Sequence, residues 1–117
     1  MLNKARIAVL VSGGGTNLEA LFNAQAAGAL PHGEIVAVLS SNPDAFALER
    51  ARRRGVPAVP LSRKQLGQAK FEAALTKKLT EYRADLLVLA GFLSILSADF
   101  VRRWPDRIVN VHPSLIP

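Results

Sequence analysis

Short apolar runs alternate with amphipathic stretches along the chain, which predicts strands and helices in turn. The run at residues 6–12 is almost wholly apolar, as is typical of a strand buried on both faces of a parallel sheet. After it, Leu18, Leu21 and Phe22 share one stripe at helical spacing. The same reasoning predicts strands at 6–12, 35–40, 58–61, 85–90 and 108–111, a first helix that ends near 27, and helices at 44–54, 71–82 and 98–103.

This alternation predicts an α/β fold: a doubly wound, mostly parallel sheet of Rossmann-like type with helices on both faces. Pro60 lies in the third apolar run, and because proline cannot donate to a strand ladder, we expect that strand at a sheet edge. No repeat or linker divides the 117 residues, so we expect a single domain over 1–117. The last predicted strand lies just before residue 117 and would leave a bare sheet edge, so we expect the fold to be truncated.

Composition narrows the possible partners. Fifteen Lys and Arg against nine Asp and Glu give a net charge of +6, which favours anionic ligands. The basic clusters at 50–54, 63–64, 77–78 and 102–107 lack interleaved aromatic residues, so we interpret them as solvated helix faces and do not expect a nucleic acid partner. With no cysteine, no membrane-length apolar run and no secretory signal, we expect a cytoplasmic protein without disulfides or a membrane partner.

A glycine-rich loop with the sequence SGGGTN, residues 12–17, separates the first strand from the first helix. Glycines let backbone amide groups approach a ligand, and a helix N-terminus offers unpaired donors, so the loop predicts a phosphate-binding site. The structural alternative is a capping box, in which the Thr16 hydroxyl caps the helix and Glu19 reaches back. The loop matches neither the Walker pattern nor the dinucleotide pattern, which favours a small phosphorylated metabolite.

Asn110 and His112 lie at the end of the last predicted strand. Residues two apart in a strand project to the same side, so both can point to one place at the carboxyl edge of the sheet, beside the glycine loop. An amide donor next to an imidazole suits a reaction that builds up an oxyanion. The alternative is a strand-end histidine that donates to a backbone carbonyl, and His32, in a Pro-His-Gly turn, receives only such a structural interpretation.

Four segments together resemble the phosphoribosylglycinamide formyltransferase family: VSGGGTNL at 11–18, LSSN at 39–42, AGFLSILS at 90–97 and NVHPSLIP at 110–117. The resemblance covers the whole chain in the right order. It implies the formyltransferase fold and transfer of a formyl group from 10-formyltetrahydrofolate to the amine of glycinamide ribonucleotide, in purine biosynthesis. It implies no metal and no covalent enzyme intermediate.

The resemblance also implies roles for single residues. Gly15, Thr16 and Asn17 would hold the phosphate of the ribonucleotide. Asn110 would stabilise the tetrahedral oxyanion, and His112 would donate a proton. The residues implied to line the folate pocket, largely through backbone contacts, are Leu93, Ser94, Ile95, Leu96 and Asn110.

The sequence departs from the family at several points. Gln68 stands where members commonly carry a basic residue, and Ser94 where they commonly carry an arginine. Members are also considerably longer, and the further part supplies an aspartate that raises the pKa of the histidine. We therefore expect residues 1–117 to bind the substrate phosphate weakly and to catalyse little alone.

Two other functions remain open. A methionyl-tRNA formyltransferase-like enzyme would share the His-Pro-Ser-Leu stretch, although a tRNA acceptor needs no small-phosphate cradle. A non-catalytic nucleotide- or nucleic-acid-binding module would agree with the positive charge. A monomer and a homodimer are both compatible with the sequence.

Overall fold

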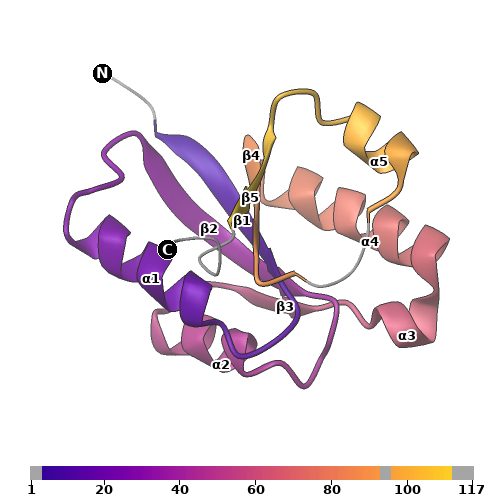
Figure 1. Ribbon diagram of the computed structural model, residues 1–117, viewed down its shortest axis with the longest axis horizontal. Coiled ribbons are helices and arrows are strands. Elements are labelled where there is room, and N and C mark those ends of the chain that lie inside the picture. Colours follow the sequence, from indigo (N-terminus) through magenta and orange to yellow (C-terminus); the bar gives the residue numbers. More distant parts are fainter. Residues whose placement is uncertain (1–3, 93–95, 112–117) are drawn as a thin grey trace, which may run out of the picture.

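The structure, a computed structural model, describes residues 4–92 and 96–111, which form one sheet with helices on both faces (Figure 1). The strands are β1 (Ala5–Val11), β2 (Gly33–Ser40), β3 (Ala58–Pro60), β4 (Leu86–Ala90) and β5 (Ile108–Val111). All pairings are parallel, in the order β3-β2-β1-β4-β5. The helices are α1 (Thr16–Ala26), α2 (Phe46–Arg53), α3 (Arg63–Leu66), α4 (Gln68–Glu81) and α5 (Ala98–Arg102). This confirms the doubly wound α/β fold.

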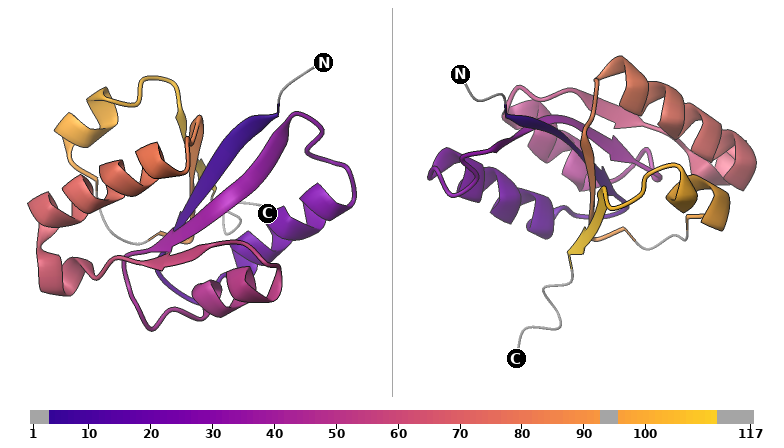
Figure 2. Two further views of the ribbon diagram at one scale, coloured as in Figure 1. Left: turned by 180° about the vertical axis from the view of Figure 1, so that it is seen from behind. Right: turned by 90° about the horizontal axis from the view of Figure 1, so that it is seen from above.

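Helices lie on both faces of the sheet (Figure 2). On each face one apolar cluster holds them against the strands. Successive side chains of a strand point to opposite faces, so Val9 of β1 enters one cluster and Leu10 the other. On one face α1 and α2 contribute Leu18, Phe22, Ala47 and Ala51. On the other, α4 and α5 contribute Phe71, Leu75, Leu79 and Phe100. Both faces of the central strand are therefore buried, which explains its unbroken apolar sequence.

The register between β1 and β2 contains one irregularity. Ile7 pairs with Ile35 but Ala8 pairs with Ala37, so Val36 is an extra residue in β2. A bulge of this kind shifts the alternation by one position. Ile35 therefore faces α1 and α2, whereas Ala37, two residues later, faces α4. A simple alternation of period two does not predict this change of face.

The observed elements differ from the predicted ones at several boundaries: β2 begins at Gly33 rather than 35 and α4 at Gln68 rather than 71. Two further differences have a clear local cause. Helix α2 begins at Phe46 rather than at 44, because the Asn42 side chain accepts from the Asp44 amide and the Asn42 carbonyl accepts from the Ala45 amide, which makes a turn there. The short helix α3 was not predicted; the Ser62 hydroxyl caps it by accepting from the Gln65 amide.

The short strand β3 lies at an edge of the sheet, which confirms the position predicted from Pro60. Strand β5 forms the opposite edge. The chain order reverses direction across the sheet between β1 and β4, and in sheets of this type ligands bind beside the carboxyl ends of the strands at such a reversal. Among the described residues, no helix is long and apolar enough to cross a membrane.

Candidate functional site

The glycine-rich loop leaves the carboxyl end of β1 at this reversal and leads directly into α1. Gly15 is the residue before α1 and has a φ of 84°, in the left-handed region that favours glycine. A Cβ atom on Gly15 would lie 2.7 Å from the Cβ of Ala47 and 2.8 Å from its Cα. Helix α2 therefore packs against the loop so closely that only glycine fits at this position.

The capping box that Thr16 and Glu19 match is not formed. Thr16 is the first residue of α1 rather than its cap, and no side chain caps the helix. The Glu19 carboxylate instead accepts from Arg54 at 2.6 Å and from Arg50 at 3.2 Å, both on the side of α2. The structural alternative, a capping box, is therefore not found: Gly15 rather than Thr16 holds the cap position, and Glu19 pairs with the arginines of another helix.

The loop presents a row of backbone amide groups that find no acceptor in the part of the chain that the structure describes. The Gly13 carbonyl accepts from the Ala47 amide at 3.1 Å, and the Gly14 carbonyl accepts from Nε of Arg50 at 2.7 Å. Since N–H and C=O of a trans peptide point in opposite directions, the amide groups of Gly14 and Gly15 point away from α2. Within residues 4–92 and 96–111, the amides of 14–18 donate to no other residue. Such a set of donors at a helix N-terminus suits a phosphate group.

Asn17 connects this loop to the end of β4. It is half-buried in the first turn of α1, and its Nδ2 atom lies 3.7 Å from the position that a Cβ on Gly91 would occupy. Gly91 directly follows β4. The carboxyl ends of β1 and β4 thus meet at the side chain of a residue that the sequence assigns to phosphate binding.

Asn110 lies on β5, one strand farther along the same edge. It pairs with Leu89 of β4, which pairs with Leu10 of β1, so Asn110 and Leu10 are two strand spacings apart, or about 10 Å. Asn110 is exposed. Ile108 packs in the cluster on the side of α4 and α5, and since residues two apart share a face, Asn110 projects on that side as well.

The other predicted site residues fall into two groups. Leu96 is partly buried and packs against the apolar cluster of α4 and α5. Leu93, Ser94, Ile95 and His112 lie outside the described residues. In the part of the chain that the structure describes, no three His, Asp or Glu side chains are grouped as metal ligands would be.

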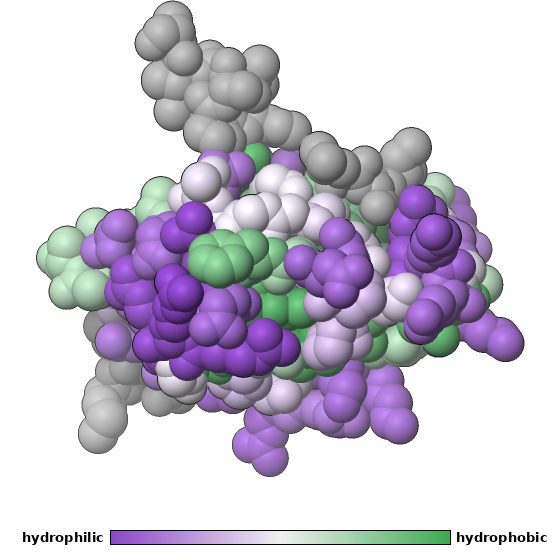
Figure 3. Space-filling model, turned by 90° about the horizontal axis from the view of Figure 1, so that it is seen from below, coloured by the Kyte–Doolittle hydropathy of each residue, from purple (hydrophilic) through white to green (hydrophobic). Residues whose placement is uncertain are grey.

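The arginines of α2 do not form a uniform solvated face, which corrects the sequence interpretation. Hydrophilic side chains do gather on the side of the molecule where α1 and α2 lie (Figure 3). The side chains of Arg52 and Arg53 are 56% and 64% exposed, but those of Arg50 and Arg54 are only 25% and 33% exposed, because both contact α1. Their shared partner Glu19 lies 31 and 35 residues away in sequence, so no local pattern could have identified them.

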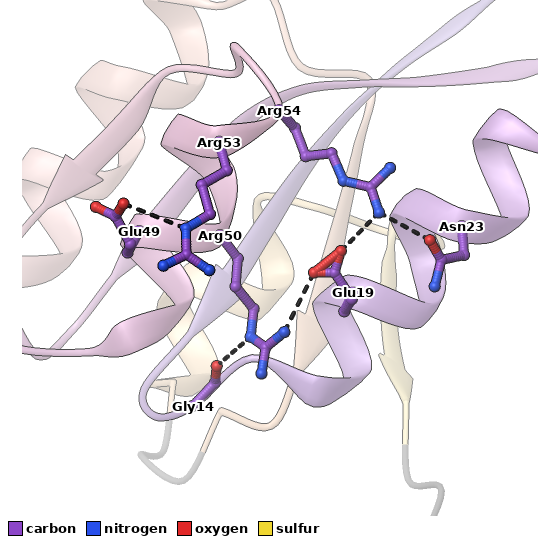
Figure 4. A network of polar contacts seen from close by, with 7 residues as sticks. All are labelled: Gly14, Glu19, Asn23, Glu49, Arg50, Arg53 and Arg54. Atoms are coloured by element: carbon purple, nitrogen blue, oxygen red, sulfur yellow. Dashed lines mark hydrogen bonds and ion pairs between the residues drawn. The ribbon is translucent and has the colours of Figure 1, made fainter.

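Figure 4 shows this network between α1, α2 and the glycine loop. Arg50 extends from α2 to both the Gly14 carbonyl and the Glu19 carboxylate, while Arg54 joins Glu19 to the Asn23 side chain. The hydrogen bond from Arg54 holds the pKa of Glu19 below its ordinary value. Burial acts in the opposite direction and raises this pKa, while the hydrogen bond from Arg50 lowers it further. The carboxylate thus remains ionised and keeps both arginines in place.

A second carboxylate, Glu72 of α4, lies in a groove between α4 and α5. It accepts from the Ser97 amide at 2.7 Å, from the Ser97 hydroxyl at 2.6 Å and from Nε2 of Gln68 at 2.7 Å. Burial raises the pKa of Glu72, but these hydrogen bonds outweigh burial and hold it below the ordinary value. Gln68, where the resemblance expects a basic residue, also accepts from Arg63, so a guanidinium lies beside that position.

Comparison with known proteins supports one family. The formyl transferase family matches residues 5–117. The chain is 44% identical over 116 residues to the trifunctional purine biosynthetic protein adenosine-3 of Drosophila melanogaster, covering 97% of this chain and 9% of that protein. It is 39% identical over 112 residues to the phosphoribosylglycinamide formyltransferase of Escherichia coli (strain K12), covering 95% of this chain and 52% of that protein.

Solved structures give the same result. The phosphoribosylglycinamide formyltransferase of Coxiella burnetii superposes with a TM-score of 0.88 at 38% identity, covering 98% of this chain and 54% of that one. A formyltetrahydrofolate deformylase from Pseudomonas putida superposes with a TM-score of 0.85 at 26% identity, covering 96% and 39%. The chain spans about half the length of the curated phosphoribosylglycinamide formyltransferases that it matches. On its sequence and on its fold, the chain belongs to the formyl transferase family.

Proposed function

We propose that residues 1–117 form the phosphate-binding and oxyanion-stabilising part of a phosphoribosylglycinamide formyltransferase. One observation carries the proposal: backbone amide groups of the glycine loop, which donate to no described residue, and an exposed amide side chain, Asn110, lie along one edge of the sheet, two strands apart. The names of several relatives, among them the phosphoribosylglycinamide formyltransferases of Escherichia coli and Coxiella burnetii, support this substrate.

In this proposal the phosphate of glycinamide ribonucleotide lies against the loop. The amides of Gly15, Thr16 and Asn17 donate to its oxygen atoms, and the positive end of the α1 dipole favours its charge. The Asn17 side chain, next to Gly91, lies between the phosphate and the middle of the site. The ribose then extends along the edge toward β5.

At the far end of the substrate, the amine nitrogen attacks the formyl carbon of 10-formyltetrahydrofolate. A carbon–nitrogen bond to the substrate forms, the bond to the folate nitrogen breaks, and a proton passes from the amine to the leaving nitrogen. We assign stabilisation of the oxyanion to the Asn110 side chain and proton donation to His112. The donor would be held by residues 93–96 through backbone contacts and by Asn110.

Binding tests this proposal without requiring turnover. The affinity of the chain for glycinamide ribonucleotide is compared by calorimetry with its affinity for the riboside that lacks the phosphate. We expect the phosphate to strengthen binding at least about tenfold, since hydrogen bonds to a charged group contribute on the order of 1.5–3 kcal/mol. Equal affinity for the two ligands would show that the loop does not hold a phosphate.

Formyl transfer tests the role of Asn110 and separates the alternatives. Because residues 1–117 are expected to catalyse little alone, the rate is measured in a single turnover with the chain in excess. Any consumption of 10-formyltetrahydrofolate should depend on glycinamide ribonucleotide, and Asn110→Ala should lower this single-turnover rate by about 100-fold or more, as expected for one lost oxyanion donor. Hydrolysis of the donor without the ribonucleotide would instead indicate a deformylase. Formylation of methionyl-tRNA, or nucleic acid binding with a steep salt dependence, would support the other two alternatives.

A further inference from the structure

We propose that Arg50 is a positioning residue for phosphate binding: it fixes the orientation of the Gly14–Gly15 peptide group so that the Gly15 amide faces the substrate. This inference rests on the proposed function and deepens it. Arg50 lies on α2, outside the loop, and the sequence gives no sign that the two are in contact.

Among the described residues, one group, Arg50, donates to the carbonyl of the Gly14–Gly15 peptide. Its carbonyl oxygen accepts from Nε of Arg50 at 2.7 Å, so its N–H group points to the opposite side, away from α2. A peptide group with glycine on both sides can rotate more easily than any other, because no Cβ atom restricts its dihedral angles. Without the arginine, the carbonyl oxygen could turn toward the phosphate and repel it.

Arg50 is itself held by three further contacts, of which Figure 4 shows the one with Glu19. One of its terminal nitrogens is paired with Glu19 at 3.2 Å, and its guanidinium carbon lies 5.1 Å from the centre of the Phe46 ring. Its Cδ atom lies 3.1 Å from the position that a Cβ on Gly15 would take, so its aliphatic part supports the loop directly. The guanidinium is therefore placed before any ligand arrives.

The neighbouring Arg53 provides a matched comparison. It also lies over the Phe46 ring, with its guanidinium carbon 5.1 Å from the ring centre, and it pairs with Glu49 of its own helix at 3.4 Å. It makes no contact with the glycine loop among the interactions of the described residues. Arg50 and Arg53 therefore share charge, helix and aromatic partner, and differ in that Arg50 contacts Gly14 and pairs with Glu19, whereas Arg53 pairs with Glu49.

The test is the preference for glycinamide ribonucleotide over its riboside, measured by calorimetry in Arg50→Lys and Arg53→Lys. Both variants keep the charge, but lysine lacks the Nε–H group that Arg50 places on the Gly14 carbonyl. We expect the preference to fall about tenfold in Arg50→Lys and to stay unchanged in Arg53→Lys. Affinity for the riboside should be the same in both, which excludes general damage to the fold.

An unchanged preference in Arg50→Lys would overturn the inference, because it would show that charge alone is sufficient. If the wild-type chain shows no preference, the proposed function itself fails, and the two failures are thereby distinguished. Glu19→Gln gives a second test should Arg50→Lys not fold. If Glu19 acts only through its negative charge, its removal should strengthen binding of the phosphate. If Glu19 holds Arg50 in place, its removal should weaken binding of the phosphate. Stronger binding would also overturn the inference.

Discussion

Gly15 shows how a single residue serves both packing and binding. Its left-handed backbone turns the chain from β1 into α1, and its lack of a side chain lets Ala47 of α2 approach the loop. Close packing of α2 in turn brings Arg50 to the Gly14 carbonyl. The feature that suggests a phosphate site in the sequence is thus also a requirement of the contact between two helices.

Replacement of Gly15 by alanine should therefore destabilise the fold strongly. The left-handed backbone and the overlap with Ala47 should together lower the free energy of unfolding by about 2–4 kcal/mol. Gly14→Ala is the control, because its added Cβ would meet no atom within 4 Å and its φ is not in the left-handed region. Urea denaturation measures both, and equal stabilities would contradict the packing argument.

At the scale of elements, short helices depend on contacts with longer ones. Helix α5 has five residues, too few to be stable alone. Ser97 attaches it in two ways: its hydroxyl accepts from the Phe100 amide as the helix cap and donates to Glu72 of α4. The buried Phe100 completes the attachment. A sequence pattern predicts the helix, but α4 supplies the partner that stabilises it.

Ser97→Ala should reveal this attachment. It removes the cap and one of the hydrogen bonds to Glu72, so we expect the free energy of unfolding to fall by about 1–2 kcal/mol in urea denaturation. Ser97→Thr keeps the hydroxyl and should retain most of the wild-type stability. A threonine variant as unstable as the alanine variant would mean that the hydroxyl does not carry the effect.

At the scale of the whole molecule, each face of the sheet has one carboxylate that joins its helices. Glu19 joins α1 to the arginines of α2, and Glu72 joins α4 to the start of α5. Apolar packing supplies the buried surface on both faces of the sheet. The two carboxylates fix the positions of the helices relative to one another. The pKa of each lies below its ordinary value in the folded protein.

The free energy of unfolding should therefore decrease in acid, and Glu19 and Glu72 should account for part of this decrease. Their ionised forms stabilise the fold above the ordinary glutamate pKa of 4.5, and this contribution is lost as the pH falls from there through the lowered folded-state value. The free energy of unfolding of Glu19→Gln combined with Glu72→Gln should change less than that of wild type between about pH 6 and about pH 3. Glu81→Gln, at an exposed ion pair with Lys78, should follow wild type.

Much of the fold could be predicted from sequence because it depends on local order. The apolar run of β1, the helical stripe of Leu18 and Phe22, and the proline of β3 each identify their element, and the alternation of elements gives the parallel, doubly wound sheet. Even the edge shared by the glycine loop and Asn110 follows, since carboxyl ends of parallel strands lie together. The extra residue Val36 could not be predicted, because its neighbours in the strand are also apolar and the pattern does not show a bulge.

The sequence by itself thus determined the order of the strands and longer helices, the family, and the position of the glycine loop and Asn110 at one edge of the sheet. Only the tertiary structure decided which polar groups meet there. Glu19 has the spacing of a cap but pairs with arginines 31 and 35 residues away, and Glu72 meets Ser97 at a separation of 25 residues. Periodicity within a segment determines which face of an element is buried, whereas partners between segments depend on how the packed helices bring distant side chains into reach.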